Sequence, residues 1–187
     1  FDLPMFGTVS SDDHYTGHKA AAFGGTTTVM DFVPLEFPSP VIGRGAGGEG
    51  VFKHSVDLWM EKAQKAAIDY SFHMNLTKFD DGIAKEIPSL VEMGITTLKV
   101  FTAYNGRLRI DDGSIFRALR IAKENGMLMM AHCENGDVIE TLVPEALAAG
   151  HVTPEWHALT RPAWGAVAAT LRVAAMASEA DAAVYIV

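Results

Sequence analysis

Five short runs rich in apolar and β-branched residues, separated by segments of helical periodicity, constrain the fold of this chain most strongly. These runs lie at 26–32, 68–74, 96–103, 128–134 and 182–187. Apolar residues recur at helical spacing over 56–63 and 115–122, and an alanine-rich segment, 166–177, follows Pro162. Strands that alternate with helices form βαβ units with parallel pairing. The sequence therefore predicts an α/β protein, either a doubly wound sheet or a (β/α)8 barrel.

The number of predicted strands is too small for a complete barrel. A (β/α)8 barrel takes ~250 residues, whereas this chain has 187 residues and about five strands, the last of which runs to Val187. We therefore expect part of a larger fold. The segment 34–50 interrupts the pattern with three prolines and five glycines. We interpret it as a loop, although Gly43, Gly45 and Gly48 match a weak phosphate-binding pattern.

Composition excludes several classes of partner. The formal net charge is −8, which argues against a nucleic-acid surface because such a surface needs clustered Lys and Arg. No apolar run approaches the ~20 residues that span a bilayer. The only cysteine, Cys133, has no internal partner for a disulfide, which fits a reducing cytosol. We expect a cytoplasmic protein that binds neither nucleic acid nor membrane.

Lys99 lies at the centre of an apolar strand, in "TTLKVFTAYNG". Because strand side chains alternate, Leu98 and Val100 point to one face while Lys99 and Phe101 point to the other. A structural lysine here would reach solvent or pair with a carboxylate. A buried lysine instead has a lowered pKa, and its neutral amine can form a Schiff base or a carbamate that bridges two metal ions. Both interpretations remain open from Lys99 alone.

His132 strengthens the functional interpretation. It lies at the end of the run "LMMAHCE", where parallel α/β folds build their sites, and Cys133 points to the opposite face as a small core residue. His73 and Asp31 are weaker candidates for the same cavity. Tyr104 offers a phenol donor near the mouth of the pocket, or else simply packs. Four other histidines lie in loops or helical patterns and are expected to be structural: His14, His18, His151 and His157.

Four motifs resemble the D-hydantoinase and dihydropyrimidinase family of cyclic amidohydrolases. They are "LKVFTAY", "DYSFHM", "AHCENGD" and "TPEWHALTRP". The resemblance implies a (β/α)8 TIM barrel of the amidohydrolase type, accompanied by a small β-sandwich. Residues 1–187 would form the central part of this single catalytic barrel, with the flanking strands and the sandwich outside the sequence.

The resemblance also implies roles for individual residues. Lys99 would be carboxylated and bridge two divalent metal ions, most often zinc, with manganese as an alternative. His132 would ligate one of these ions. Tyr104 would hydrogen-bond the substrate carbonyl and its oxyanion. Leu3, Met5 and Phe101 would contact the substituent of the ring.

The expected activity is metal-dependent hydrolysis of a cyclic amide bond in hydantoins or dihydropyrimidines, giving N-carbamoyl amino acids, by a homotetramer or homodimer. The family's H-x-H ligand pair would fall immediately before Phe1, another histidine would follow Val187, and a catalytic aspartate lies further on. Asp2 stands where dihydroorotases have an arginine, which disfavours a carboxylated ring. An allantoinase-like enzyme and a non-enzymatic dihydropyrimidinase-related scaffold are the alternatives.

Overall fold

A five-stranded parallel sheet forms the centre of the structure, a computed structural model that describes residues 1–5, 7–36 and 50–187. Its strands are β3 (Thr28–Val33), β4 (Asp69–Asn75), β5 (Thr97–Phe101), β6 (Leu128–His132) and β7 (Val184–Ile186). All five predicted strands are confirmed. Their spatial order follows the sequence without reversal, as in a barrel wall, whereas a doubly wound sheet reverses its order at a switch point.

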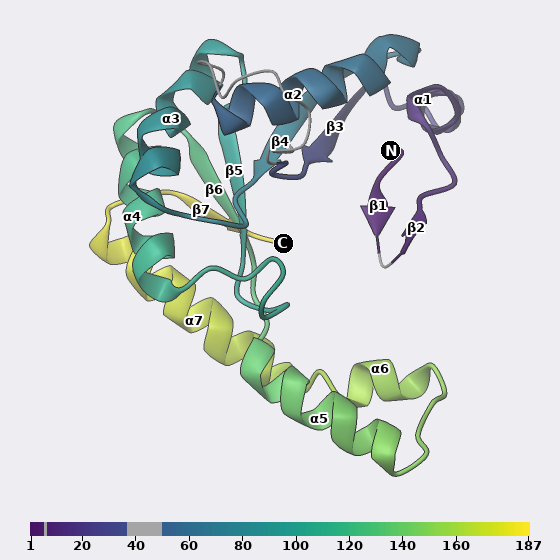
Figure 1. The fold of residues 1–187 in the computed structure, drawn as a ribbon, viewed down its shortest axis with the longest axis vertical. Coiled ribbons are helices and arrows are strands. Elements are labelled where there is room, and N and C mark those ends of the chain that lie inside the picture. Colours follow the sequence, from purple (N-terminus) through teal and green to yellow (C-terminus); the bar gives the residue numbers. More distant parts are fainter. Residues whose placement is uncertain (6, 37–49) are drawn as a thin grey trace, which may run out of the picture.

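Helices cover one face of this sheet (Figure 1). They are α2 (Val51–Lys62), α3 (Asp81–Glu92), α4 (Asp112–Glu124) and α7 (Ala163–Glu179). Leu98 and Val100 of β5 and Met129 of β6 are fully buried on that side, together with Ile115 of α4. The helical patterns at 56–63, 115–122 and 166–177 fall within α2 and the 3₁₀ turn that extends it, α4 and α7, and are confirmed.

Side-chain caps determine where several helices begin. The carboxylate of Asp111 accepts a hydrogen bond from the Ser114 N–H at 3.0 Å, and that of Asp80 accepts one from the Ile83 N–H at 3.0 Å. Pro162 immediately precedes α7, where its fixed φ suits a helix start. The sequence did not single out α3, which contains Pro88 in its interior.

Two smaller units flank the sheet. At the N-terminal end, β1 (Pro4–Met5) and β2 (Thr8–Val9) form an antiparallel hairpin followed by α1 (His14–Phe23). After β6, α5 (Gly136–Ala148) and α6 (Glu155–Leu159) form a hairpin that extends away from the sheet (Figure 1). The expected loop at 34–50, including its glycine pattern, lies outside the described residues except for 34–36 and 50.

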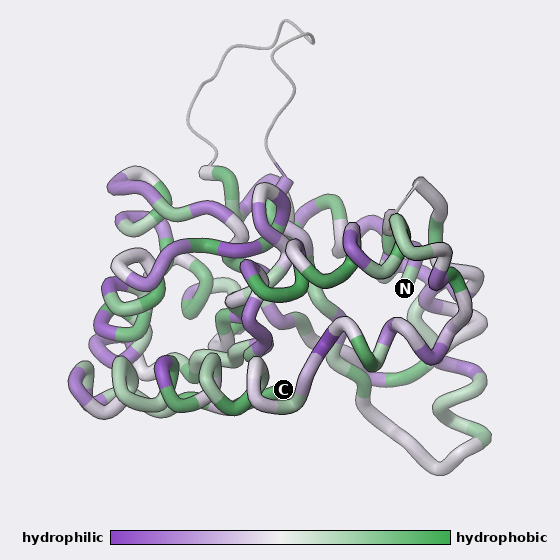
Figure 2. Tube along the Cα trace, turned by 90° about the horizontal axis from the view of Figure 1, so that it is seen from below, coloured by the Kyte–Doolittle hydropathy of each residue, from purple (hydrophilic) through white to green (hydrophobic). Residues whose placement is uncertain are grey.

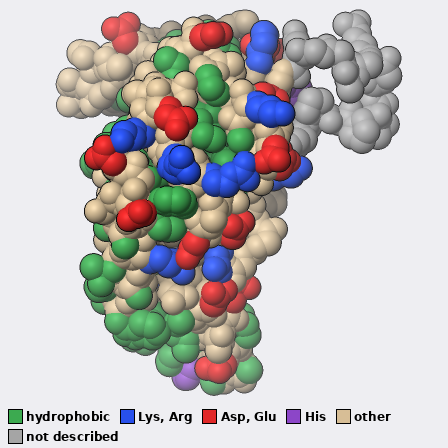
Figure 3. All heavy atoms as spheres, turned by 90° about the vertical axis from the view of Figure 1, so that its left-hand side faces the viewer, with side chains coloured by type: hydrophobic (Ala, Val, Ile, Leu, Met, Phe, Trp, Pro, Cys, Tyr) green, Lys and Arg blue, Asp and Glu red, His purple; other side chains and the backbone are tan. Residues whose placement is uncertain are grey.

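The outer surface carries mixed charge. Figure 2 shows hydrophobic and hydrophilic residues alternating along the helices, and Figure 3 shows basic and acidic side chains interspersed on the helical side. Ion pairs join neighbouring helices there, as between Arg117 and Asp81 (2.6 Å) and between Arg172 and Asp112 (3.4 Å). Among the described residues, no helix is long and apolar enough to cross a membrane.

Helix α1 is anchored by two fully buried histidines one turn apart. His14 and His18 are both 0% exposed, and His14 Nδ1 lies 3.3 Å from His18 Nε2. His18 Nδ1 accepts a hydrogen bond from the Ala67 N–H at 3.2 Å, and Asp31 Oδ2 lies 3.7 Å from His14 Nε2. Their expected structural role is consistent with this packing. Their complete burial was not predicted.

Because of these two buried histidines, we expect the folded protein to lose stability as the pH falls. Burial lowers the pKa of both His14 and His18 below the ordinary value. The unfolded chain therefore binds protons below pH ~6.5 while the folded chain resists them, so the free energy of unfolding should fall as pH drops below ~6.5, by up to ~1.4 kcal/mol per pH unit for each histidine. Urea unfolding between pH 5 and 8 measures this slope. The variant His14→Phe should flatten it, and an unchanged slope would contradict the assignment.

Candidate active site

Lys99 and His132 project from adjacent strands to the same face of the sheet. In the parallel register, Lys99 pairs with Met130 and Phe101 pairs with His132. Paired residues of neighbouring strands point to the same side, so all four lie on the face opposite the helices. Leu98 and Val100 point into the helical layer, as the alternation predicted.

Lys99 is buried among aromatic rings. The residue is 7% exposed, and its Nζ lies 4.7 Å from the ring centre of Phe32 and 5.0 Å from that of Phe101. Within the described ranges it has no ion-pair partner, so the structural interpretation as a carboxylate-paired lysine is not supported there. Burial lowers the pKa of the Lys99 ammonium group, because a low-polarity environment disfavours the charged form.

An aromatic cluster connects His132 to the loop after β5. The rings of Tyr104 and His132 are stacked, with centroids 5.4 Å apart and 23° between their planes, and Phe101 lies 5.9 Å from His132. Tyr104 has φ +66°, a left-handed backbone conformation that is costly for a non-glycine residue and is concentrated at functional sites. Burial raises the pKa of its phenol, which therefore stays protonated and able to donate.

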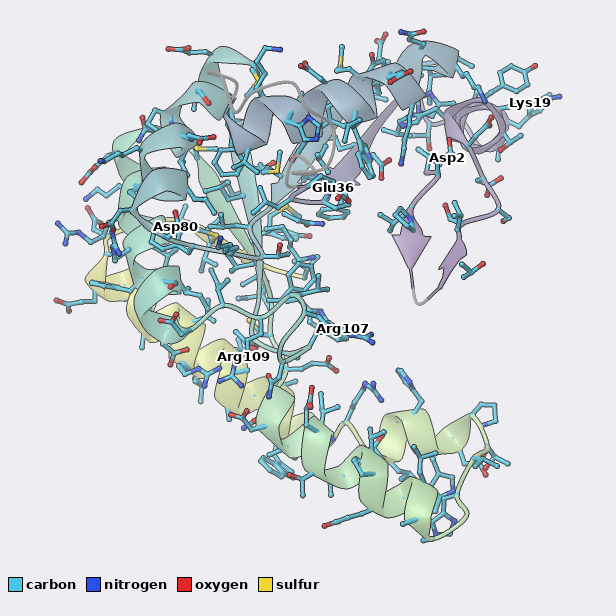
Figure 4. All side chains as sticks on the ribbon, in the orientation of Figure 1. Asp2, Lys19, Glu36, Asp80, Arg107 and Arg109 are labelled. Carbon is cyan, nitrogen blue, oxygen red and sulfur yellow. The ribbon has the colours of Figure 1, made fainter. Side chains whose placement is uncertain are left out.

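The loop after β5 is bound to the first turn of α5, the helix that follows β6. Asn105 Nδ2 and Arg109 Nη1 both donate to Asp137 Oδ1, at 2.8 and 2.6 Å. Figure 4 labels Arg109 in the loop that follows β5. A Cβ at Gly136, the first residue of α5, would lie 2.9 Å from Ala103 Cα, so only glycine permits this approach of the loop to the helix. Tyr104 and His132 therefore keep a defined separation.

The other candidates divide between the two faces. His73 pairs with Phe32 in the register and lies on the Lys99 face, with its Nδ1 2.5 Å from Thr97 Oγ1. Burial, and next the charge of Lys99, lower the pKa of His73. Asp31 pairs with Phe72 on the opposite face and approaches His14, so its candidacy for this cavity was wrong. Cys133 is buried in the hydrophobic core, as expected.

The residues expected to contact a ring substituent are not all brought together. Phe101 lies beside Lys99, Tyr104 and His132. Leu3 precedes β1 and packs, half-buried, against the hydrophobic core. Met5 lies in β1, and its side chain is outside the described part of the chain. The proximity of Leu3 and Met5 to a substrate stays a prediction.

Two residues next to His132 were not singled out from the sequence. Glu134 Oε2 lies 2.7 Å from His132 Nε2, and the hydroxyl of Thr102 contacts the backbone of Glu134. Glu134 is part of the motif "AHCENGD" and lies two residues after His132. Side chains two residues apart in an extended segment point to the same side, and this signal could have identified Glu134. Thr102 follows β5 without any such signal.

No family model matches the chain. It is 42% identical to a D-hydantoinase of Geobacillus stearothermophilus over 188 residues, which cover 100% of the chain and 38% of that protein. It is 34% identical to a dihydropyrimidinase of Arabidopsis thaliana, covering 99% of the chain and 33% of that protein. The crystal structure of a dihydropyrimidinase from Brevibacillus agri NCHU1002 superimposes with a TM-score of 0.88 at 43% identity, over 99% of the chain and 38% of that structure.

The chain belongs to the D-hydantoinase and dihydropyrimidinase family. The predicted fold is confirmed with it: the five parallel strands are part of the amidohydrolase-type (β/α)8 barrel of these relatives. The chain spans only 38% of the length of the first D-hydantoinases that it matches.

The described residues include two candidate metal ligands, Lys99 and His132, but not a complete set. No group of three or more His, Cys, Asp or Glu side chains that could hold a metal occurs among the described residues. Lys99 and His132 nevertheless provide one buried amine and one imidazole on a common face. The amine would become an anionic ligand on carboxylation, and imidazole is a common zinc ligand. These two residues would fit a divalent metal centre only together with further ligands.

Proposed function

We propose that the protein containing this chain hydrolyses a cyclic amide bond in hydantoins or dihydropyrimidines and releases N-carbamoyl amino acids. The observation that supports this most directly is Lys99, which is buried on the same face as His132 and has no carboxylate partner among the described residues. Lysine is almost never fully buried unless it is paired, so a buried lysine on this face is a candidate for chemistry. Membership of a family whose curated relatives are named D-hydantoinase and dihydropyrimidinase supports the substrate class.

Lys99 and His132 would hold two divalent metal ions, with zinc the first choice and manganese the alternative. The Lys99 amine is available for carboxylation because burial lowers its pKa. The free amine adds to carbon dioxide and loses one proton, giving a carbamate whose two oxygens can each bind one metal. When bound, such ions lower the pKa of water toward ~7 and polarise the substrate carbonyl.

The remaining residues would bind and orient the ring. The Tyr104 phenol, which keeps its proton because burial raises its pKa, would donate to the substrate carbonyl oxygen as negative charge develops there. Phe101, Leu3 and Met5 would line the space for the ring substituent. The catalytic group that carries the proton to the leaving nitrogen would come from another part of the protein.

We further propose that residues 1–187 are the central part of one (β/α)8 catalytic barrel, and that the flanking strands and a small β-sandwich belong to other parts of the protein. The coverage of 38% of a D-hydantoinase supports this arrangement. We expect a cytoplasmic homotetramer or homodimer, as the family resemblance implies.

The proposed activity is tested with the full-length protein. Hydantoin and dihydrouracil should be opened to their N-carbamoyl products, and activity should fall at least tenfold after dialysis against a chelator and return on addition of Zn²⁺ or Mn²⁺. Allantoin serves as the competing substrate, and a clear preference for it would identify the allantoinase-like alternative. A full-length protein that binds no metal and opens none of these rings would instead be a scaffold.

A further inference from the structure

The contact between His132 and Glu134 has the geometry of a charge-assisted hydrogen bond. His132 Nε2 lies 2.7 Å from Glu134 Oε2, within the range for a nitrogen donor and a carboxylate. Both side chains are largely covered, with 27% of His132 and 21% of Glu134 exposed. No other acidic side chain contacts His132 among the residues that the structure describes. Partial burial protects this contact from competition by water.

This contact determines which nitrogen of His132 carries the proton. A carboxylate accepts hydrogen bonds and donates none, so Nε2 must bear the hydrogen. In a neutral imidazole the other nitrogen, Nδ1, then has a free lone pair. Histidines that ligate metals commonly donate their second N–H to a carboxylate in this way, which holds both the tautomer and the orientation of the ring.

Thr102 in turn holds Glu134. The Thr102 hydroxyl accepts a hydrogen bond from the Glu134 N–H at 3.0 Å and lies 2.7 Å from the Glu134 carbonyl oxygen. Its backbone N–H donates to the His132 carbonyl at 3.0 Å. Thr102 is only 1% exposed and lies three residues after Lys99. The segment that carries His132 and Glu134 is thus connected directly to the strand that carries Lys99.

We propose that Glu134, held in place by Thr102, is a positioning residue that fixes His132 in the tautomer with a free Nδ1 for a divalent metal. This inference rests on the proposed function for the metal, but the effect on the His132 tautomer does not require it. Glu134 acts through His132 and need not touch the substrate.

The test compares Glu134→Gln and Glu134→Ala with Glu140→Gln in the full-length protein. Glu140 is an exposed residue of α5, so its variant makes the same charge change away from His132. Two quantities are measured: the dissociation constant for Zn²⁺, and the tautomer of His132 in the metal-free protein by ¹⁵N-histidine NMR, with the signal assigned through His132→Asn. Glu134→Ala should weaken Zn²⁺ binding by roughly 10–100-fold and reduce the population of the Nε2–H tautomer. Glu134→Gln keeps an oxygen that can accept from Nε2–H and should show a smaller change in the same direction, whereas Glu140→Gln should change neither.

The outcomes separate the inference from the proposed function. Unchanged metal affinity and an unchanged tautomer in Glu134→Gln and Glu134→Ala would overturn the positioning role. Loss of a whole metal equivalent at saturating Zn²⁺ would also overturn it, because Glu134 would then be a ligand. A changed tautomer in a protein that binds no metal would support the role of Glu134 and refute the metal centre.

Substitutions of Thr102 provide a second test in case the Glu134 variants do not fold. Thr102→Ser keeps the hydroxyl and should leave the His132 tautomer and the metal affinity near those of the wild type. Thr102→Val removes the hydroxyl and should shift both in the same direction as Glu134→Gln. Equal values in Thr102→Ser and Thr102→Val would contradict the role of Thr102, and equal melting temperatures of all variants confirm that a shift is not caused by unfolding.

Discussion

Replacing Lys99 by alanine in the full-length protein should remove bound metal and ring-opening activity together. The alanine side chain has no amine to carboxylate, so no anionic bridge between two metal ions can form. Metal catalysis contributes several kcal/mol to such reactions, so turnover should fall by roughly 10³-fold or more. Metal content by elemental analysis and product formation from hydantoin or dihydrouracil measure the two effects.

The control for this experiment is Lys19→Ala, which removes an exposed lysine of α1, a residue labelled in Figure 4. It should retain both metal and activity. A short carboxylic acid added to Lys99→Ala should restore part of the activity by supplying the missing carboxylate. Full metal content and normal turnover in Lys99→Ala would refute the bridging role of Lys99, whatever the substrate of the enzyme.

Tyr104→Phe should slow turnover while leaving the metal in place. The substitution removes only the phenol hydroxyl and preserves the ring that stacks on His132 with centroids 5.4 Å apart. Loss of one well-placed donor to a developing oxyanion costs about 3–4 kcal/mol, or roughly 10²–10³-fold in kcat. Steady-state kinetics should therefore show a large fall in kcat with a small change in KM, and elemental analysis should show unchanged metal content.

Tyr15→Phe is the matched control, because Tyr15 is an exposed residue of α1. A change in kcat of less than threefold is expected for it. If Tyr104→Phe raised KM and left kcat unchanged, Tyr104 would bind the ground state and not the oxyanion. If it lost metal, the stack of Tyr104 on His132 would be a support for the metal centre instead.

The parallel sheet could be predicted from local patterns because strand and helix periodicity are properties of short segments. Alternation along β5 was enough to place Lys99 opposite Leu98 and Val100, and the register with β6 confirmed that His132 shares its face. The same reasoning failed for Asp31. Its place in β3 was predictable, but the register with β4 puts it beside Phe72, on the side of His14.

Contacts between distant segments were beyond sequence reasoning. Thr102 lies 30 residues from His132, and no pattern within β5 indicates that its hydroxyl holds the backbone of Glu134. The complete burial of His14 and His18 was missed for a similar reason, since Ala67, whose N–H binds His18, is 49 residues away. Such contacts depend on loop geometry, which local propensity does not encode.

The sequence by itself determined the family and the alternation of strands and helices, and it predicts Lys99 and His132 as metal ligands. It could do so because the spacing of motifs and the alternation of side chains along a strand depend only on residues that are close together in the chain. Only the tertiary structure decided that Lys99 is buried between Phe32 and Phe101, with no carboxylate partner in the part of the chain that the structure describes, and that Glu134 is in contact with His132 Nε2. Burial and hydrogen-bond partners are set by the packing of strands and loops far apart in the chain, and burial in turn lowers the pKa of Lys99.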